Sequence, residues 1–113
     1  MSGVIVTYDG AFDVIGTLAT GNTSGVQTAP GITVSEDNSV LLAWFTDDEG
    51  NRSWSNQTSG LTEVVADDTG NGAPSWVLYE DAIGAGASGD RQATCSGTNS
   101  GDFAVLIALK PKT

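Results

Sequence analysis

Two stretches of this sequence, SVLLAWFT at residues 39–46 and DFAVLIALK at residues 102–110, place apolar side chains on both faces of any β-strand that they form. Successive side chains of a strand point to opposite faces, so a strand with two apolar faces needs a cover on each. The core of a two-layer sandwich covers only one of them. The chain must therefore cover the second face by other means or leave an apolar surface for a partner.

The remaining chain repeats a similar pattern of short strand-forming runs, rich in Val, Ile, Thr and aromatic residues and separated by Gly, Asn and Asp. No segment has the cap and the 3.6-residue period of a helix. The pattern predicts an all-β fold: an antiparallel two-sheet sandwich, jelly-roll-like, with about eight to nine short strands. Candidate strands lie at residues 4–9, 12–20, 31–36, 39–46, 52–58, 61–67, 75–83, 90–97 and 102–110.

The length of 113 residues fits a single sandwich domain, residues 1–113. Asp and Glu number 14 against 4 Lys and Arg, which gives a formal net charge of -10. Such a surface repels phosphate backbones and anionic lipid headgroups, so neither nucleic acid nor a membrane is expected as a partner. The sequence shows no leader pattern and no apolar run long enough to cross a bilayer, so we expect a soluble protein without its own export signal.

Catalytic chemistry finds little support in the residues. The chain has no histidine, and its single cysteine, Cys95, alternates with Ala93 on one strand face, which is typical of a buried small side chain. Adjacent carboxylates point to opposite faces when they lie on a strand and face solvent when they lie in a turn. We therefore expect no enzyme and no cofactor. The adjacent pairs are Asp47-Asp48, Asp67-Asp68 and Glu80-Asp81.

Two oxygen-rich loops, DDEGN at 47–51 and DDTGNG at 67–72, could suit calcium. Neither has the ligand spacing of a calcium loop, so self-stabilised turns without a metal are expected, and a weak ion remains the alternative.

The segment AIGAGASGDRQ contains a literal G-x-G-x-x-G at Gly84, Gly86 and Gly89. A dinucleotide site needs these glycines between a strand and a helix. The residues that follow them alternate like a strand, so the segment is interpreted as a connection between two strands.

One aromatic side chain differs from the others in its surroundings. Trp54 shares its strand face with Arg52 and Asn56, a combination that could contact a sugar or a partner protein. The alternative is that Trp54 covers the end of the core. Trp44 and Trp76 lie in apolar strands and are expected in the core.

Several motifs follow one another in a familiar order: TAPGITVSEDNSVLLAWF, then SGLTEVVAD, then LYEDAIGAGASGDRQATCSGTNSGDFAVLIALKP. Over about residues 16–111 the chain resembles the jelly-roll or β-sandwich module of phage virion proteins, in capsid decoration or tails, and of bacterial surface proteins. Leu61 departs from that pattern, which usually has an aromatic residue there.

The resemblance implies a structural virion protein, expected to be a capsid decoration protein that binds the major capsid protein or another virion protein and stabilises the shell. It would be assembled in the host cytoplasm and lie on the virion surface. The alternative is a carbohydrate-binding or adhesion module of a tail fibre or surface protein.

A homo-oligomer is expected from the doubly apolar strands, and the resemblance favours a trimer. The predicted interface is the stripe assigned to the outer face of these strands, with a covering loop at residues 20–30 as the alternative. The stripe comprises Leu41, Ala43, Phe45, Ala104, Leu106 and Ala108.

Overall fold

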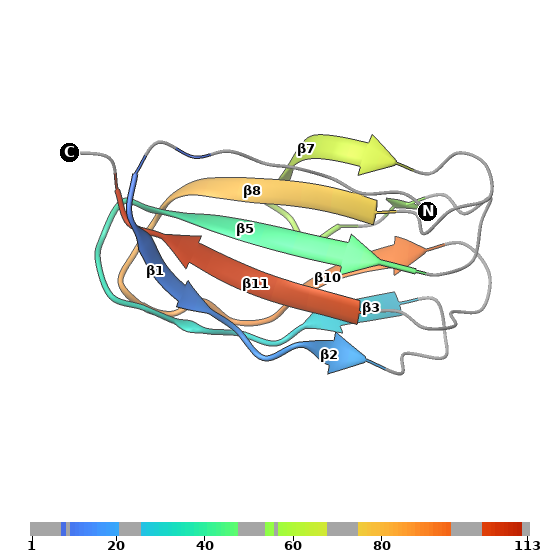
Figure 1. Ribbon diagram of the computed structural model, residues 1–113, viewed down its shortest axis with the longest axis horizontal. Coiled ribbons are helices and arrows are strands. Elements are labelled where there is room, and N and C mark those ends of the chain that lie inside the picture. Colours follow the sequence, from blue (N-terminus) through green and yellow to red (C-terminus); the bar gives the residue numbers. More distant parts are fainter. Residues whose placement is uncertain are drawn as a thin grey trace.

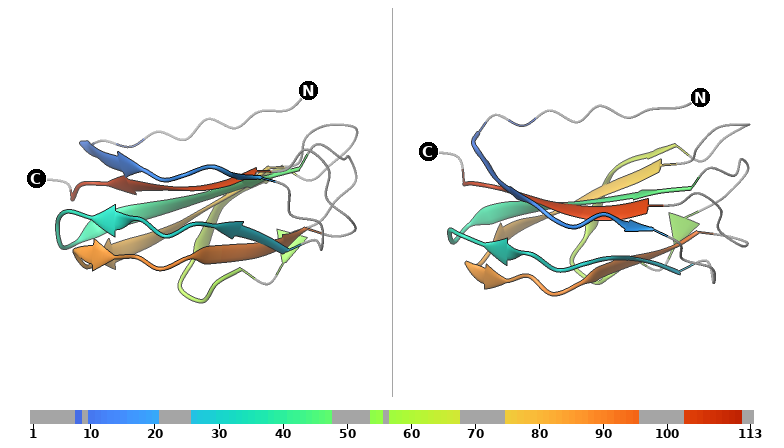
Figure 2. Two further views of the ribbon diagram at one scale, coloured as in Figure 1. Left: turned by 90° about the horizontal axis from the view of Figure 1, so that it is seen from below. Right: turned by 60° about the horizontal axis from the view of Figure 1, so that its bottom comes forward.

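The computed structural model describes residues 8, 10–20, 26–47, 54–55, 57–67, 75–95 and 103–111. Within these residues the chain forms eleven strands and no helix, and every strand pairing is antiparallel. The strands lie in two layers (Figures 1 and 2), which confirms the predicted all-β sandwich. They are β1 (Phe12–Ile15), β2 (Ala19–Thr20), β3 (Val26–Ala29), β4 (Thr33–Val34), β5 (Ser39–Thr46), β6 (Trp54–Ser55), β7 (Thr62–Asp67), β8 (Ser75–Ile83), β9 (Gly86–Ala87), β10 (Arg91–Cys95) and β11 (Phe103–Leu109).

The larger layer is a six-stranded sheet in the order β1-β11-β5-β8-β7, with β2 also paired to β11. Its central strands, β5 and β11, are the two stretches that are apolar on both faces. Central positions suit them because neighbouring strands on both sides satisfy their backbone hydrogen bonds. The sheet therefore presents an inner face to the second layer and an outer face whose centre is also apolar.

The second layer consists of two short ladders that follow one another along the same pair of chain segments. β3 pairs with β10 and β4 pairs with β9, while β6 extends the first ladder. Two hydrogen bonds bridge the gap between the two ladders. Ser88 N donates to Ile32 O at 2.8 Å, and Gly31 N donates to Asp90 Oδ1 at 2.8 Å. The smaller layer is thus one long antiparallel pair of segments, residues 26–34 and 86–95, lying under the larger sheet (Figure 2).

The core lies between the two layers and is built by matching large with small side chains. On neighbouring strands β5 and β11, Phe45 pairs with Ala104, Ala43 with Leu106, and Leu41 with Ala108, and each of these side chains is 0% exposed. The alternation keeps the surface of the sheet even, so the second layer can pack closely on it. From that layer come Ala29, Ile32, Val34 and Ala93, all buried.

These pairings correct the predicted interface. The stripe of Leu41, Ala43, Phe45, Ala104, Leu106 and Ala108 was expected on the outer face, and all six side chains lie in the core instead. The prediction failed because β5 and β11 are apolar on both faces, so the sequence does not show which face points to the core. Side chains alternate along a strand, so assigning the wrong face misplaces all six residues of the stripe together.

Several strands differ in extent from the prediction. Residues 12–20 form two strands separated by residues 16–18, and the backbone N–H of Gly16 donates to Leu106 O at 2.7 Å. Residues 31–36 retain only β4, and residues 52–58 contain only β6 among those described. Part of the expected covering loop, Val26–Ala29, is β3 in the second layer. The candidate strand at residues 4–9 lies outside the described residues except for Tyr8, which is not in a strand.

The G-x-G-x-x-G segment connects β8 to β10, as interpreted, and also contributes the short strand β9. Gly86 has φ of 112° and Gly89 has φ of 74°, conformations that side chains with a Cβ rarely adopt. Gly86 and Gly89 are therefore required by the turn itself, and no helix follows them in the described chain.

Two polar contacts join the layers at their edges. Arg91 of β10 forms an ion pair with Glu80 of β8 at 2.9 Å, with side chains 13% and 26% exposed. Asp13 of β1 accepts hydrogen bonds from the backbone N–H and the hydroxyl of Ser35, at 3.0 and 2.9 Å. These two donors stabilise the carboxylate and lower the pKa of Asp13 below its ordinary value.

Candidate binding surface

The outer face of the larger sheet carries the second set of apolar side chains from the central strands. Val40, Leu42 and Trp44 of β5 lie on this face, together with Ile107 and Leu109 of β11, which pair with Leu42 and Val40. Val40, Leu42, Trp44 and Ile107 are half-buried. The prediction that Trp44 belongs to the core is therefore wrong, because it alternates with Phe45 and the inner face is the one that Phe45 occupies.

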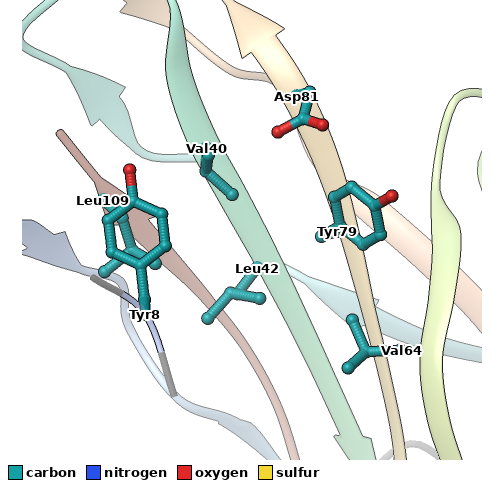
Figure 3. A pocket seen from close by; sticks show the side chains of 7 residues that line it. All are labelled: Tyr8, Val40, Leu42, Val64, Tyr79, Asp81 and Leu109. Carbon is teal, nitrogen blue, oxygen red and sulfur yellow. The ribbon is translucent and has the colours of Figure 1, made fainter. Parts of the chain in front are cut away.

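A groove of about 250 Å³ crosses this face, and we call it the outer groove. Figure 3 shows Val40 and Leu42 along its floor, with Tyr8 and Leu109 to one side and Tyr79 and Val64 to the other. Its single acidic residue lies at one end, above Tyr79. The lining of the outer groove is Tyr8, Val40, Leu42, Val64, Tyr79, Asp81 and Leu109.

Tyr8 closes one side of the outer groove from outside the sheet. Its hydroxyl donates a hydrogen bond to Lys110 O at 2.6 Å, which fixes the ring beside Leu109 (Figure 3). Gly10 makes this placement possible, because a Cβ at position 10 would overlap the Tyr8 ring. Tyr8 belongs to the candidate strand at residues 4–9, so its part in a surface groove was not foreseen.

Asp81 lies at the end of the outer groove, on the same face as Tyr79, because the side chains of β8 alternate regularly up to this residue. An irregularity in β8 follows it. Ser39 pairs with Ile83 and Leu41 with Glu80, so β8 has one more residue than β5 between these pairs. Ala82, the next residue, has φ of 55°, a left-handed conformation that is uncommon outside glycine. Such bulges bend a strand and change the direction of its side chains, and left-handed non-glycine residues are enriched at functional sites. Asp81 is exposed, whereas its neighbour Glu80 points to the second layer, as alternation predicts.

A second apolar surface lies on the chain segment that forms the β1 edge of the same sheet, and we call it the edge patch. Phe12, Ile15 and Leu18 are 58%, 59% and 53% exposed. Phe12 and Ile15 pair with Leu109 and Ile107, which places them on the outer face beside the outer groove. Large apolar side chains gathered at this exposure are typical of surfaces that contact another molecule.

The predicted contact residue Trp54 packs against the core. Its ring stacks on Trp76 at a centroid distance of 6.1 Å and lies 6.4 Å from Phe45. Trp54 is half-buried, which agrees with the alternative that it covers the end of the core. Arg52 and Asn56 lie outside the described residues, as does most of the two loops considered for calcium.

A buried polar cluster lies at the same end of the sandwich. Gln27 is 0% exposed and donates a hydrogen bond from Nε2 to Thr46 O at 2.8 Å, and its Oε1 has no hydrogen-bond partner. Asp47 is 1% exposed and accepts from the Cys95 thiol at 3.4 Å. Asp47 was expected to face solvent, and that expectation is wrong. The predicted burial of Cys95 beside Ala93 is confirmed.

Among the described residues, no group of three or more Cys, Asp or Glu side chains could hold a metal ion. This part of the chain also contains no helix that could span a membrane. The outer groove and the edge patch are two features of the described residues that could bind another molecule. No known protein family, no curated protein and no solved structure matches the chain.

Proposed function

We propose that this protein is a structural component of a phage particle, a decoration protein that binds the assembled capsid and reinforces it. The observation that carries the proposal is the apolar outer face of the larger sheet, including the edge patch. A two-layer sandwich normally exposes polar side chains there. The resemblance of the sequence to virion modules supplies the kind of particle, and the proposal places the protein on the virion surface as a non-enzyme.

The mechanism follows from mass action. A subunit that binds the assembled shell, and not its separated parts, shifts the equilibrium toward the shell. Phe12 and Ile15 are each more than half exposed, so burying each against a partner contributes about 1–2 kcal/mol. Several copies per shell multiply this stabilisation.

The proposal includes self-association, with a trimer favoured by the resemblance. The edge patch is the surface for it, because its three apolar side chains are exposed, whereas the stripe predicted from the sequence lies in the core. The edge patch has no charged side chain of its own. Its nearest carboxylate in sequence, Asp13, is already held by Ser35.

The test compares particles assembled without the protein before and after the purified protein is added. We expect co-sedimentation with the shell and a higher temperature of genome release. Ile15→Glu should abolish binding and reduce the protein to monomers by light scattering, because it places a charge in the contact. Thr33→Glu, which adds the same charge at an exposed site on the second layer, is the control. Shells that neither bind the wild-type protein nor become more heat-resistant would overturn the proposal.

A further inference from the structure

The outer groove differs from the edge patch in having a carboxylate at one end. No described residue forms an ion pair or a hydrogen bond with Asp81. The two described basic side chains are engaged elsewhere, Arg91 with Glu80 at 2.9 Å and Lys110 with Glu36 at 3.7 Å. The outer groove thus combines an apolar floor with an unpaired negative charge.

The size of the outer groove restricts what can occupy it. Its volume of about 250 Å³ lies below the roughly 300–1,000 Å³ of sites that enclose a small molecule. It is large enough for one or two side chains of a polypeptide. Tyr8 and Tyr79 on opposite sides offer ring surfaces, which attract both apolar groups and the cationic heads of Lys and Arg.

Charge decides between a second copy of this chain and a different partner. Contact between two copies through the outer groove would bring their unpaired Asp81 carboxylates toward the same interface, whereas the edge patch has no such charge. A partner that supplies a cation neutralises Asp81 instead. An unpaired charge enclosed in an apolar contact is costly, so the groove favours a basic occupant.

We propose that the outer groove binds a segment of the shell protein in which apolar side chains flank a Lys or Arg. The apolar side chains lie on Val40 and Leu42, and the cation reaches Asp81 past the Tyr79 ring. This inference rests on the proposed function and names the chemistry of the partner.

The test uses three fluorescein-labelled pentapeptides, with two leucines flanking a lysine, two leucines flanking a glutamate, and two serines flanking a lysine. Each is titrated into the full chain by fluorescence polarisation, and amide NMR shifts locate the contact. We expect the leucine–lysine peptide to bind most tightly and to shift the Leu42, Tyr79 and Asp81 amides. Asp81→Asn should weaken it about two- to fivefold, the range for an exposed ion pair, and Tyr79→Ala should weaken it further.

Asp90→Asn is the matched control. It removes the same charge from an exposed loop of the second layer, and its side-chain oxygen can still accept from Gly31 N. Equal weakening by Asp81→Asn and Asp90→Asn, or equal affinity for the lysine and glutamate peptides, would overturn the inference. So would NMR shifts that show the groove occupied by a second copy.

Shell co-sedimentation separates this inference from the proposed function. If the wild-type protein and Asp81→Asn bind the shell equally well, the groove inference fails and the proposed function stands. If the wild-type protein does not bind the shell, the proposed function fails whatever the peptides do. Weaker shell binding by Asp81→Asn, with Asp90→Asn unchanged, supports both.

Discussion

Two neighbouring leucines of β5 allow the two faces of the larger sheet to be distinguished by stability. Leu41 is fully buried between the layers, and Leu42 is half-buried on the floor of the outer groove. Replacing each with alanine removes the same atoms from the same strand. Any difference between Leu41→Ala and Leu42→Ala therefore reports their surroundings.

The expected losses follow from burial. Leu41 is paired with Ala108, which cannot extend to fill the space that a shortened side chain leaves, so a cavity remains. Buried leucines in this situation cost about 2.7–5.0 kcal/mol, and we expect about 3–4 kcal/mol for Leu41→Ala. At position 42 water enters the space from the groove. Only the transfer term for a partly buried side chain is lost, about 1 kcal/mol.

Urea unfolding followed by far-ultraviolet circular dichroism measures both losses. With a slope of about 1.5 kcal/mol per molar urea, the two midpoints should differ by more than about 1 M. Equal slopes for the wild type and both variants ensure that the midpoints report stability. Equal losses of unfolding free energy, or a larger loss for Leu42→Ala, would refute the assignment that Leu41 faces the core and Leu42 faces outward.

Two further predictions concern the turns and the layer edge. Gly86→Ala should lower the free energy of unfolding by about 1–2 kcal/mol, because Gly86 has a positive φ. Gly84→Ala in the same motif should change it by less than about 0.5 kcal/mol, since the new methyl group would meet only an ordinary contact. Thermal melts of both variants measure this difference, and equal losses would contradict it. The lowered pKa of Asp13 stabilises the fold above its unfolded pKa of about 3.9, and this contribution is lost as pH falls through the lowered folded pKa. Urea midpoints of Asp13→Ala should therefore lie below those of the wild type at pH 6 and meet them at the most acidic pH, and a constant gap would contradict the assigned cause.

The strands themselves could be predicted where the chain is strongly apolar. β5, β8 and β11 match the predicted runs to within a residue at each end, because their side chains are buried by neighbouring strands whatever the details of the fold. β3 was missed since VQTA carries no strong alternation, and its place in the sheet depends on pairing with β10. Local sequence cannot signal a strand that only its partner stabilises.

The candidate binding surface was harder to predict than the strands. Its apolar floor was visible in the sequence as a second apolar face of β5. The sequence did not show which of the two faces points outward, because that depends on how β5 side chains pack with small partners on β11, such as Ala104 and Ala108. The groove also needs Tyr8 to lie against β11, a contact between distant parts of the chain. The outward position of Asp81 follows from its alternation with Tyr79, but the bulge after it leaves no mark in the sequence, because Ala82 adopts a conformation usually signalled by glycine.

The position of β11 in the larger sheet affects how the protein is made. β11 follows every other described strand in the sequence, yet it lies between β1 and β5 and pairs with both. Until residues 103–109 have left the ribosome, β1 lacks the only described strand that pairs with it, and one side of β5 is an open apolar edge. Pairings between such distant segments slow folding. The nascent chain therefore exposes aggregation-prone surfaces until β11 is available, and a chaperone at that stage should raise the yield of folded protein.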